Sequence, residues 1–236
     1  MCGTPTVILV DRLELSLVPQ PWPFAVERRV AIDAQFAAWQ RKNPALWNGP
    51  VLMLRHYALA HGVFRGEYLE TDYASFAFWR RHCGGPAAGV YDCFSAAAVQ
   101  AADGAFLLGV MAPHTFNAGK IYFPCGTPDS NDIVGGRVDL EFSVRRELTE
   151  ETGFDPAEFL MEPGWTTVFD PPLIAHIKVF KSHESAEVLG RRALEHLAGE
   201  QKAELREIRI VRGAADINPE MESWSRAFLA QCFDAR

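Results

Sequence analysis

The sequence contains few cysteines, and no two of them have the C-x-x-C spacing. The five are scattered along the chain: Cys2, Cys83, Cys93, Cys125 and Cys232. An odd, dispersed set suggests neither a zinc site nor a disulfide framework. This usage favours a reducing compartment, and we expect a cytoplasmic protein.

Long apolar runs and an excess of basic residues are also missing. The longest apolar runs, such as residues 7–10 and 106–111, are far too short to span a bilayer, and the first residues lack the pattern of a secretory signal. With 23 Lys and Arg against 30 Asp and Glu, the formal net charge is −7. We therefore expect neither a membrane nor a nucleic-acid partner. An anionic substrate would need a local attraction, such as a bound divalent cation.

The composition is otherwise that of a globular protein. The chain has 236 residues, of which 48% are hydrophobic and 22% charged, enough for one large domain or one domain with an extension. Apolar spacing and turn residues predict strands over 6–18, 51–60, 89–100, 105–111, 121–123, 165–181 and 204–211, and helices over 27–40, 71–82, 139–152, 185–199 and 221–233. Strands and helices mix without strict alternation, which predicts the α/β (α+β) class.

Gly84-Gly85-Pro86 is the best candidate for a boundary between two regions. It separates an aromatic-rich N-terminal extension, residues 1–87, from a second region, residues 88–236. The aromatic side chains of the extension suit core packing best, with a base-stacking pocket or a dimer surface as alternatives. Residues 127–137 are rich in Pro, Asp, Ser, Asn and Gly and predict a loop, in which Gly135-Gly136 fits no phosphate-loop pattern and predicts a turn.

One segment carries a specific chemical pattern, Arg146 to Phe154 with the sequence RELTEETGF. On a helix, Glu147, Glu150 and Glu151 lie at i, i+3 and i+4, on one face. Three carboxylates so placed repel one another unless a cation lies between them, and oxygen ligands at this density suit Mg²⁺ or Mn²⁺. Arg146 is placed to pair with one of them. An exposed acidic helix is the plainer interpretation of such a string; the glycine-bearing loop before it and Gly153-Phe154 after it favour a metal site.

The segment resembles the signature of the Nudix hydrolases, G-x5-E-x7-R-E-U-x-E-E-x-G-U, where U is a bulky apolar residue. Residues 146–154 match its second half at every specified position, and Phe123-Pro124-Cys125-Gly126 is similar to the family's F-P-G-G. The first half is interrupted. Val138 stands where the signature has its first glutamate, and residues 127–137 contain an insertion of six residues.

Four carboxylates near the interruption are candidates to replace that glutamate: Asp129, Asp132, Asp139 and Glu141. Asp139 is the most economical choice for the N-cap of the helix, and Glu141 is expected to be solvated. Because the second half of the signature usually supplies the core metal ligands, we expect activity to survive the loss.

The resemblance, specific over 123–154, implies a Nudix hydrolase domain over 88–236. The implied fold is an α/β/α sandwich with a mixed central sheet. The implied reaction is metal-dependent hydrolysis of the diphosphate linkage in a nucleoside diphosphate joined to another group. Glu147, Glu150 and Glu151 would hold Mg²⁺ or Mn²⁺, with Glu151, Glu150 and Arg146 as catalytic residues and Lys120 and Gly126 binding substrate. Homodimers are common in the family, so a homodimer is compatible with this chain.

Several points stay open at this level. Glu151 is the first choice to deprotonate water, with His183, Glu184 and Glu204 as remote candidates. The run Asn43 to Gly49 faintly resembles Nudix proteins that act on UDP-sugars, which favours a nucleotide sugar over coenzyme A derivatives or dinucleoside polyphosphates. His114, Phe116 and Asn117 lie on a segment that often lines the family's substrate cleft. The alternative function is a non-catalytic Nudix-fold module that binds a nucleotide, motivated by Val138.

Overall fold

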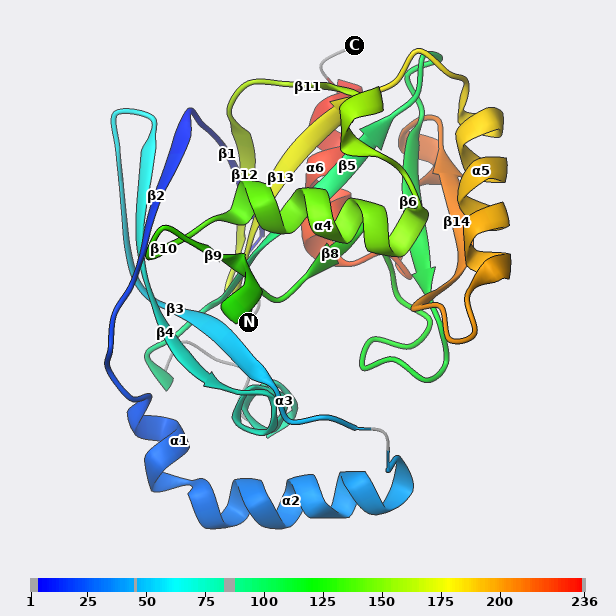
Figure 1. Cartoon of the computed structure of the whole chain (residues 1–236). Helices are drawn as coiled ribbons and strands as arrows, with labels where there is room; N and C mark the ends of the chain where they lie inside the picture. The colour runs from blue at the N-terminus through cyan, green and yellow to red at the C-terminus, as the bar shows by residue number, and fades with distance from the viewer. Residues whose placement is uncertain (1–3, 45, 83–87, 235–236) are drawn as a thin grey trace.

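The computed structural model describes residues 4–44, 46–82 and 88–234 (Figure 1). Cys2, Cys83 and the predicted boundary at Gly84-Gly85-Pro86 lie outside the described residues. The helices are α1 (Pro23–Glu27), α2 (Arg29–Lys42), α3 (Tyr73–His82), α4 (Leu140–Thr152), α5 (Ala186–Gly199) and α6 (Ser223–Asp234), with short 3-10 turns η2 (Ser130–Asp132), η3 (Pro156–Glu158) and η4 (Ala214–Asp216). Across the described ranges, no helix has the length and apolar character needed to cross a membrane.

The strands form two sheets. The larger contains β1 (Thr6–Val10), β5 (Asp92–Gln100), β6 (Phe106–Met111), β7 (Ile121–Tyr122), β8 (Cys125–Gly126), β11 (Leu160–Met161), β12 (Trp165–Asp170), β13 (Leu173–Lys181) and β14 (Leu205–Val211). The smaller contains β2 (Arg12–Leu17), β3 (Pro50–Ala60), β4 (Val63–Asp72), β9 (Ile133–Val134) and β10 (Arg137–Val138). The main path of the larger sheet is β1-β12-β13-β5-β6-β14, in which only β13 and β5 run parallel. The sheet is therefore mixed.

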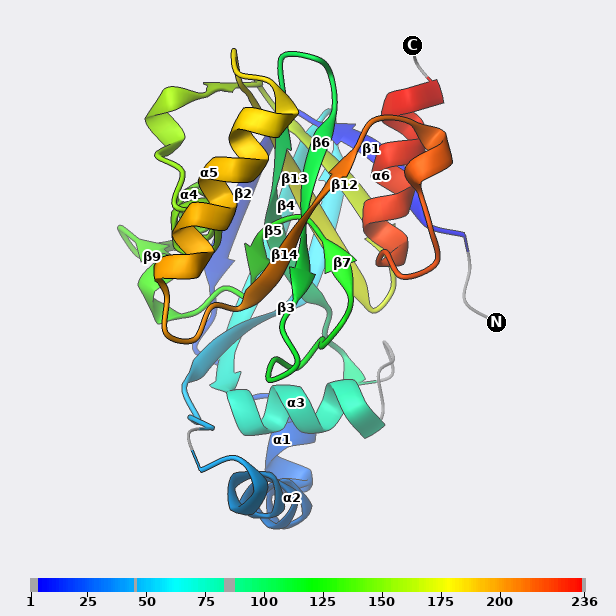
Figure 2. The same cartoon turned by 90° about the vertical axis from the view of Figure 1, so that its right-hand side faces the viewer.

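Helices cover both faces of the larger sheet. Figure 2 shows α4 and α5 on one side of it and α6 on the other. Alternate residues of β5 enter two separate cores: Cys93 and Ala97 pack with α4 and α5, while Phe94 and Ala96 pack with α6. This is an α/β/α sandwich of mixed α+β class, which confirms the predicted fold class.

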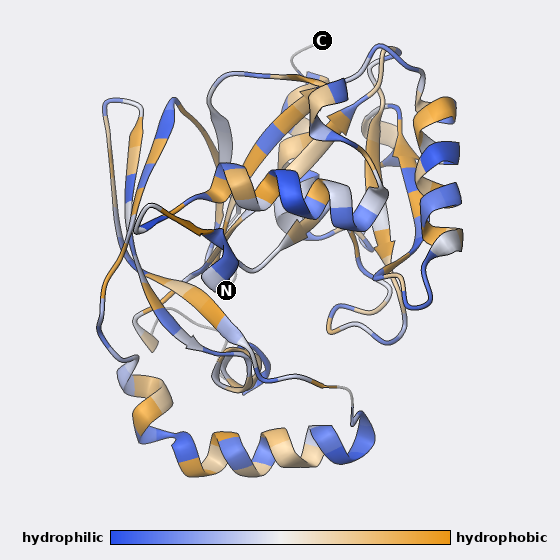
Figure 3. Cartoon of the chain, viewed as in Figure 1, coloured by the Kyte–Doolittle hydropathy of each residue, from blue (hydrophilic) through white to orange (hydrophobic). Residues whose placement is uncertain are grey.

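The smaller sheet packs against the same core as α4. Leu52, Leu54 and Phe64 of this sheet are fully buried in the cluster that contains Leu148 of α4. Figure 3 shows β3 as hydrophobic where it passes in front of the other strands. A third core, with Trp22 and Trp79 among its fully buried members, joins α1, α2 and α3. Most aromatic residues of the extension therefore pack internally, as their composition favoured.

The predicted strand over 6–18 is wrong in one respect. The chain bends at Asp11, whose backbone N–H donates to Gly62 O at 2.7 Å, so β1 and β2 enter different sheets. β1 pairs with β12 in the larger sheet, and β10, from residues C-terminal to the predicted boundary, pairs with β2 in the smaller one. Each region therefore contributes a strand to the sheet of the other.

Two further predictions need correction. The residues of β4 were not predicted as a strand, because Arg65, Glu67 and Glu70 interrupt its apolar pattern. The predicted loop over 127–137 contains η2 and the β9–β10 hairpin, although its turn at Gly135-Gly136 is confirmed by positive φ angles of 57° and 79°. The inserted residues are thus built into the smaller sheet.

Candidate active site on helix α4

Helix α4 begins and ends where the sequence predicts. The Asp139 carboxylate accepts hydrogen bonds from the backbone N–H groups of Glu141 and Phe142, which confirms it as the N-cap. At the other end Gly153 adopts φ of 72°, the left-handed conformation that terminates helices. Leu140, Val144 and Leu148 are buried along one face; this orientation turns the signature glutamates toward β8 and the solvent boundary.

Glu151 is the most enclosed of the three glutamates. The residue is 6% exposed, and its Oε2 accepts a hydrogen bond of 3.3 Å from the backbone N–H of Cys125. Burial, followed by the charges of Glu147 and Glu204, raises the pKa of Glu151 well above its usual range. A carboxylate held in this way gains strongly from a nearby cation.

Glu147 lies against the backbone of Gly126. A Cβ atom at residue 126 would come within 2.5 Å of Glu147 Cδ, so only glycine leaves room for this carboxylate. Burial raises the pKa of Glu147 to about 7; Arg146 opposes the shift, and Glu150 and Glu204 add to it. Gly126 therefore acts here by admitting a carboxylate next to the main chain.

Arg146 joins three acidic groups of the site into one network. Its Nη2 lies 3.1 Å from Asp132 Oδ1 and also 3.1 Å from Oδ2, while Nη1 lies 2.9 Å from Glu147 and 2.8 Å from Glu150. Burial alone would lower its pKa, but Glu147, Asp132 and Glu150 together raise the pKa of Arg146 above its usual value. The Glu150 side chain is 57% exposed and faces solvent. It is linked to Glu147 through their shared ion pairs with Arg146.

Asp132 stands out among the four carboxylates that are candidates to replace the signature glutamate. Its side chain is fully buried and is the one among the four candidates that contacts Arg146. Asp129 caps η2 and exchanges hydrogen bonds reciprocally with Asp132, and Glu141 pairs with Arg145 at 3.1 Å. Val138 is buried in the core, 4% exposed. The inserted loop therefore supplies the carboxylate that holds Arg146.

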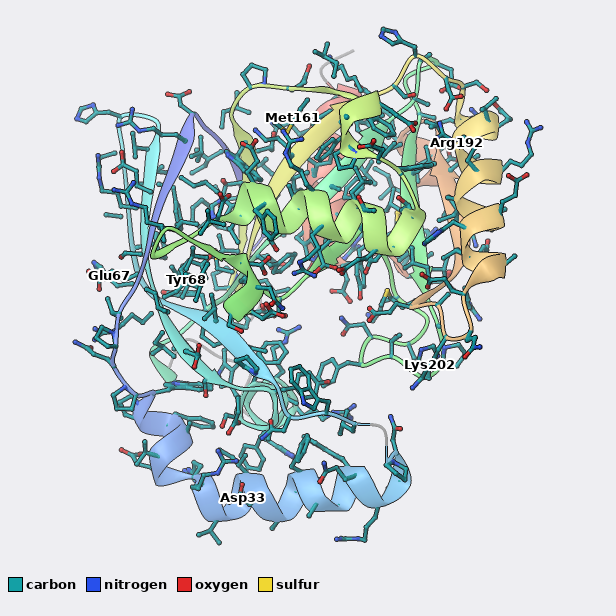
Figure 4. All side chains as sticks on the ribbon, in the orientation of Figure 1. Asp33, Glu67, Tyr68, Met161, Arg192 and Lys202 are labelled. Carbon is teal, nitrogen blue, oxygen red and sulfur yellow. The ribbon has the colours of Figure 1, made fainter. Side chains whose placement is uncertain are left out.

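A cleft of about 440 Å³ opens beside Cys125 and Gly126. Its opposite wall comes from the N-terminal region, through Asn43, Leu46, Trp47, Tyr73, Phe76 and Arg80. Lys202 and Glu204, in the connection between α5 and β14, line it from a third direction. Figure 4 shows Lys202 on the side of the central part that faces α2 and α3. The charge of Glu204 helps raise the pKa values of both Glu147 and Glu151, so it lies near this pair.

The structure brings only some of the other predicted residues to the cleft. His114, Phe116 and Asn117 line it. Lys120 is not among the residues that line the cleft. Its ammonium group lies 3.3 Å from the carboxylate of Glu222, which does line the cleft. Of the remote base candidates, Glu204 is present, whereas Glu184 pairs with Arg192 at 2.5 Å and His183 is exposed elsewhere.

Sequence reasoning missed one wall of the cleft. Tyr73, Phe76 and Arg80 lie at i, i+3 and i+7 of α3 and form a stripe along it. Arg80 Nε is 3.6 Å from Asp92, a buried residue at the start of β5. Burial raises the pKa of Asp92 to about 6, although the charge of Arg80 acts to lower it. The helical spacing of these residues was visible in the sequence, but nothing there indicated which element they would face.

The carboxylates of α4 suit a divalent cation that is held by few protein ligands. Among the described residues, no group of three or more His, Cys, Asp or Glu side chains is arranged to hold a metal. Glu147 and Glu151 nevertheless form a crowded, largely buried pair next to an open cleft, and Mg²⁺ is usually bound through one or two carboxylates together with waters and substrate phosphates. Glu150 would have to leave Arg146 to join them.

Two solved structures are similar to this chain. A MutT protein from Methanosarcina mazei Go1 has 21% identity and a TM-score of 0.41, over 61% of this chain and 94% of that one. A Nudix hydrolase from M. smegmatis, RenU, has 16% identity and a TM-score of 0.36, over 58% of this chain and 81% of that one. No protein-family model and no curated protein matches the chain.

Proposed function

We propose that this protein is a Mg²⁺-dependent Nudix-type hydrolase that cleaves the diphosphate linkage of a nucleoside diphosphate joined to another group. The observation that carries the proposal is the pair Glu147 and Glu151, held against β8 with both carboxyl pKa values raised. Buried like charges cost stability unless a cation or a catalytic task requires them. The cleft beside them is open enough for a substrate.

Glu147 and Glu151 are the side chains that would hold the metal, with Glu150 as a third ligand if it releases Arg146. When bound, Mg²⁺ neutralises diphosphate oxygens and acidifies a water molecule. Arg146 holds Glu147 and Glu150 in place while Asp132 fixes the guanidinium from the other side. The protein's own contribution is orientation and electrostatics, which are the main requirements for reaction at phosphorus.

Two carboxylates are candidates to accept the proton of the attacking water. Glu151 is our first choice, and Glu204 lines the cleft. Cys125 also lines the cleft, but burial and then the charges of Glu151 and Glu147 raise the pKa of its thiol well above the usual range. The thiol therefore stays protonated at neutral pH and is a poor nucleophile.

For the substrate we favour a nucleotide sugar, with coenzyme A derivatives and dinucleoside polyphosphates as the other classes. Asn43, Leu46 and Trp47, from the run with the faint likeness to proteins acting on UDP-sugars, line the cleft. Lys120 and Gly126 keep their proposed roles only in part: Lys120 would have to leave Glu222 to reach a phosphate, and Gly126 contributes backbone.

A non-catalytic nucleotide-binding protein is the second candidate. It is favoured by the ion pairs of Arg146, which compensate part of the negative charge of Glu147 and Glu150 without any metal. Both candidates assume a cytoplasmic protein, with which the free thiols of Cys93 and Cys125 are consistent, and leave a homodimer open.

An assay panel distinguishes the two candidates. Nucleotide sugars, coenzyme A and dinucleoside polyphosphates are incubated with the protein, with and without Mg²⁺, and monophosphate release is measured. We expect turnover of at least one substrate class that requires Mg²⁺. If no substrate is turned over while nucleotides bind, the non-catalytic candidate is favoured.

Glu151→Gln is the decisive variant in this assay. We expect its kcat to fall at least about a hundredfold with the fold intact, because a metal-centred contribution to the transition state is lost. The matched control is Glu141→Gln on the same helix, which we expect to have a small effect because Glu141 pairs with Arg145 at the helix start, away from the cleft. Unchanged kcat in Glu151→Gln would falsify the assignment.

A further inference from the structure

Trp47 is an exposed tryptophan inside the cleft. It lines the cleft, yet its relative exposure is 73%. Single exposed apolar side chains are common on protein surfaces. Trp47 differs because the main chain on both sides of it is tied to the rest of the protein.

The segment that carries Trp47 is fixed by four hydrogen bonds. Before it, Leu46 N–H donates to Asn43 O at 3.0 Å, and Gln40 Nε2 donates to Leu46 O at 3.1 Å. After it, the Asn48 side chain accepts from Ala74 N–H at 2.7 Å, and Tyr73 N–H donates to Gly49 O at 2.8 Å. The indole is thus presented from a backbone that is anchored to α2 and to the start of α3.

Gly49 makes room for the indole ring. A Cβ atom at residue 49 would come within 2.5 Å of Trp47 Cε3, so any larger residue would displace the ring. The backbone conformation at residue 49 does not itself require glycine, because its φ angle lies outside the left-handed region. The indole ring of Trp47 therefore lies directly against Gly49.

The surroundings suit a planar polar ring. Tyr73 lies beside the Trp47 segment on the cleft wall, and Arg80 and Asp92 provide charged groups in the same cleft. Burial raises the pKa of Tyr73; the charge of Arg81 opposes this shift, and the charge of nearby Glu204 adds to it. The aromatic wall and the main chain of Cys125 and Gly126, against which Glu151 and Glu147 lie, thus line the same cleft.

We propose that Trp47 stacks against the nucleobase of the ligand. This inference rests on the proposed function, because it places the base of the same nucleotide whose phosphates meet the α4 carboxylates. Aromatic stacking accepts every base, because each has a π-face, so the site selects a nucleoside over a bare sugar phosphate. The N-terminal region is then the part of the protein that recognises the nucleoside.

Binding without metal tests the proposal independently of hydrolysis. Uridine and adenosine monophosphates are titrated calorimetrically into the full chain in the presence of EDTA, with ribose 5-phosphate as the ligand that lacks a base. We expect at least one monophosphate to bind more tightly than ribose 5-phosphate. We expect Trp47→Ala to weaken that binding at least about fivefold, as loss of one base–aromatic stack does, and Trp47→Phe to retain most of it.

Gly49→Ala provides a second variant that keeps the tryptophan but displaces its ring. It should weaken monophosphate binding in the same direction, whereas Gly199→Ala, where a Cβ meets no atom within 4 Å, should not. Unchanged affinity in both Trp47→Ala and Gly49→Ala would overturn the proposal, and so would equal binding of ribose 5-phosphate.

The two proposals fail in different ways. Hydrolysis that depends on Glu151 but is insensitive to Trp47 leaves the proposed function intact and rejects base stacking. Monophosphate binding that depends on Trp47 in a protein without turnover retains base stacking and rejects hydrolysis.

Discussion

Glu147 and Glu151 differ from Glu150 in their surroundings, although all three come from one signature. Glu151 receives a backbone hydrogen bond from Cys125 and Glu147 lies against Gly126, whereas Glu150 faces solvent. At the scale of single residues, the helix alone decides which carboxylates share a face, and the neighbouring strand decides which are buried. The sequence predicted the first and had no means to predict the second.

Gly126→Ala tests the contact between that glycine and Glu147. The added methyl group would collide with the carboxylate and displace it, so we expect kcat to fall at least about tenfold, because small misplacements in an active site are costly. The flexible end of the glutamate can move, so stability should change little. Steady-state kinetics and thermal unfolding measure both effects, with Gly199→Ala as the control; full activity in Gly126→Ala would show that the contact is unimportant.

At the scale of elements, the inserted loop is part of the site. Residues 127–137 contain η2 and the β9–β10 hairpin, and they place Asp132 against Arg146. The sequence located the interruption and named Asp132 among four carboxylates. It could not choose between them because burial depends on how the hairpin pairs with β2, a strand more than a hundred residues earlier.

Removing the Asp132 carboxylate should destabilise the fold. We expect Asp132→Ala to lower the free energy of unfolding by about 3 kcal/mol, the low end for a broken buried ion pair, because Arg146 keeps Glu147 and Glu150. Urea unfolding measures this. Asp155→Ala, which removes an exposed cap of η3, should cost about 1 kcal/mol or less. Equal losses in the two variants would show that the Asp132–Arg146 pair adds nothing.

At the scale of the whole molecule, α4, α5, α6 and most central strands form where the apolar pattern predicts them. The exchange of β1 and β10 between the two sheets was not predictable, because it depends on a bend at Asp11 and on long-range pairing. The division of the chain into an N-terminal extension, residues 1–87, and a second domain, residues 88–236, therefore stays a prediction. The cleft likewise has walls from both regions.

His176, in the larger sheet, contributes to the pH dependence of global stability. His176 is fully buried, its Nδ1 lies 2.8 Å from Thr167 Oγ1, and burial lowers its pKa to about 3. In the unfolded chain the imidazole titrates near 6.5. As the pH falls below about 6.5 the unfolded chain takes up a proton that the folded protein does not, so stability decreases by up to about 1.4 kcal/mol per pH unit.

His176→Gln removes this titration and keeps a polar side chain for Thr167. We expect the stability of the wild type, relative to the variant, to decrease between pH 7 and pH 4.5 in urea unfolding. Asp92, whose raised pKa of about 6 acts in the opposite direction, is present in both proteins and cancels in the difference. A difference that does not change with pH would contradict a neutral, buried His176.

Calorimetric titration of Mg²⁺ into the wild-type chain and Glu151→Gln, without nucleotide, measures whether the α4 carboxylates bind the cation. We expect a measurable binding isotherm for the wild type and an affinity at least about tenfold weaker for the variant, because one of two ligating carboxylates is lost. Absence of Mg²⁺ binding by the wild type, or equal affinity in the two proteins, would contradict this expectation.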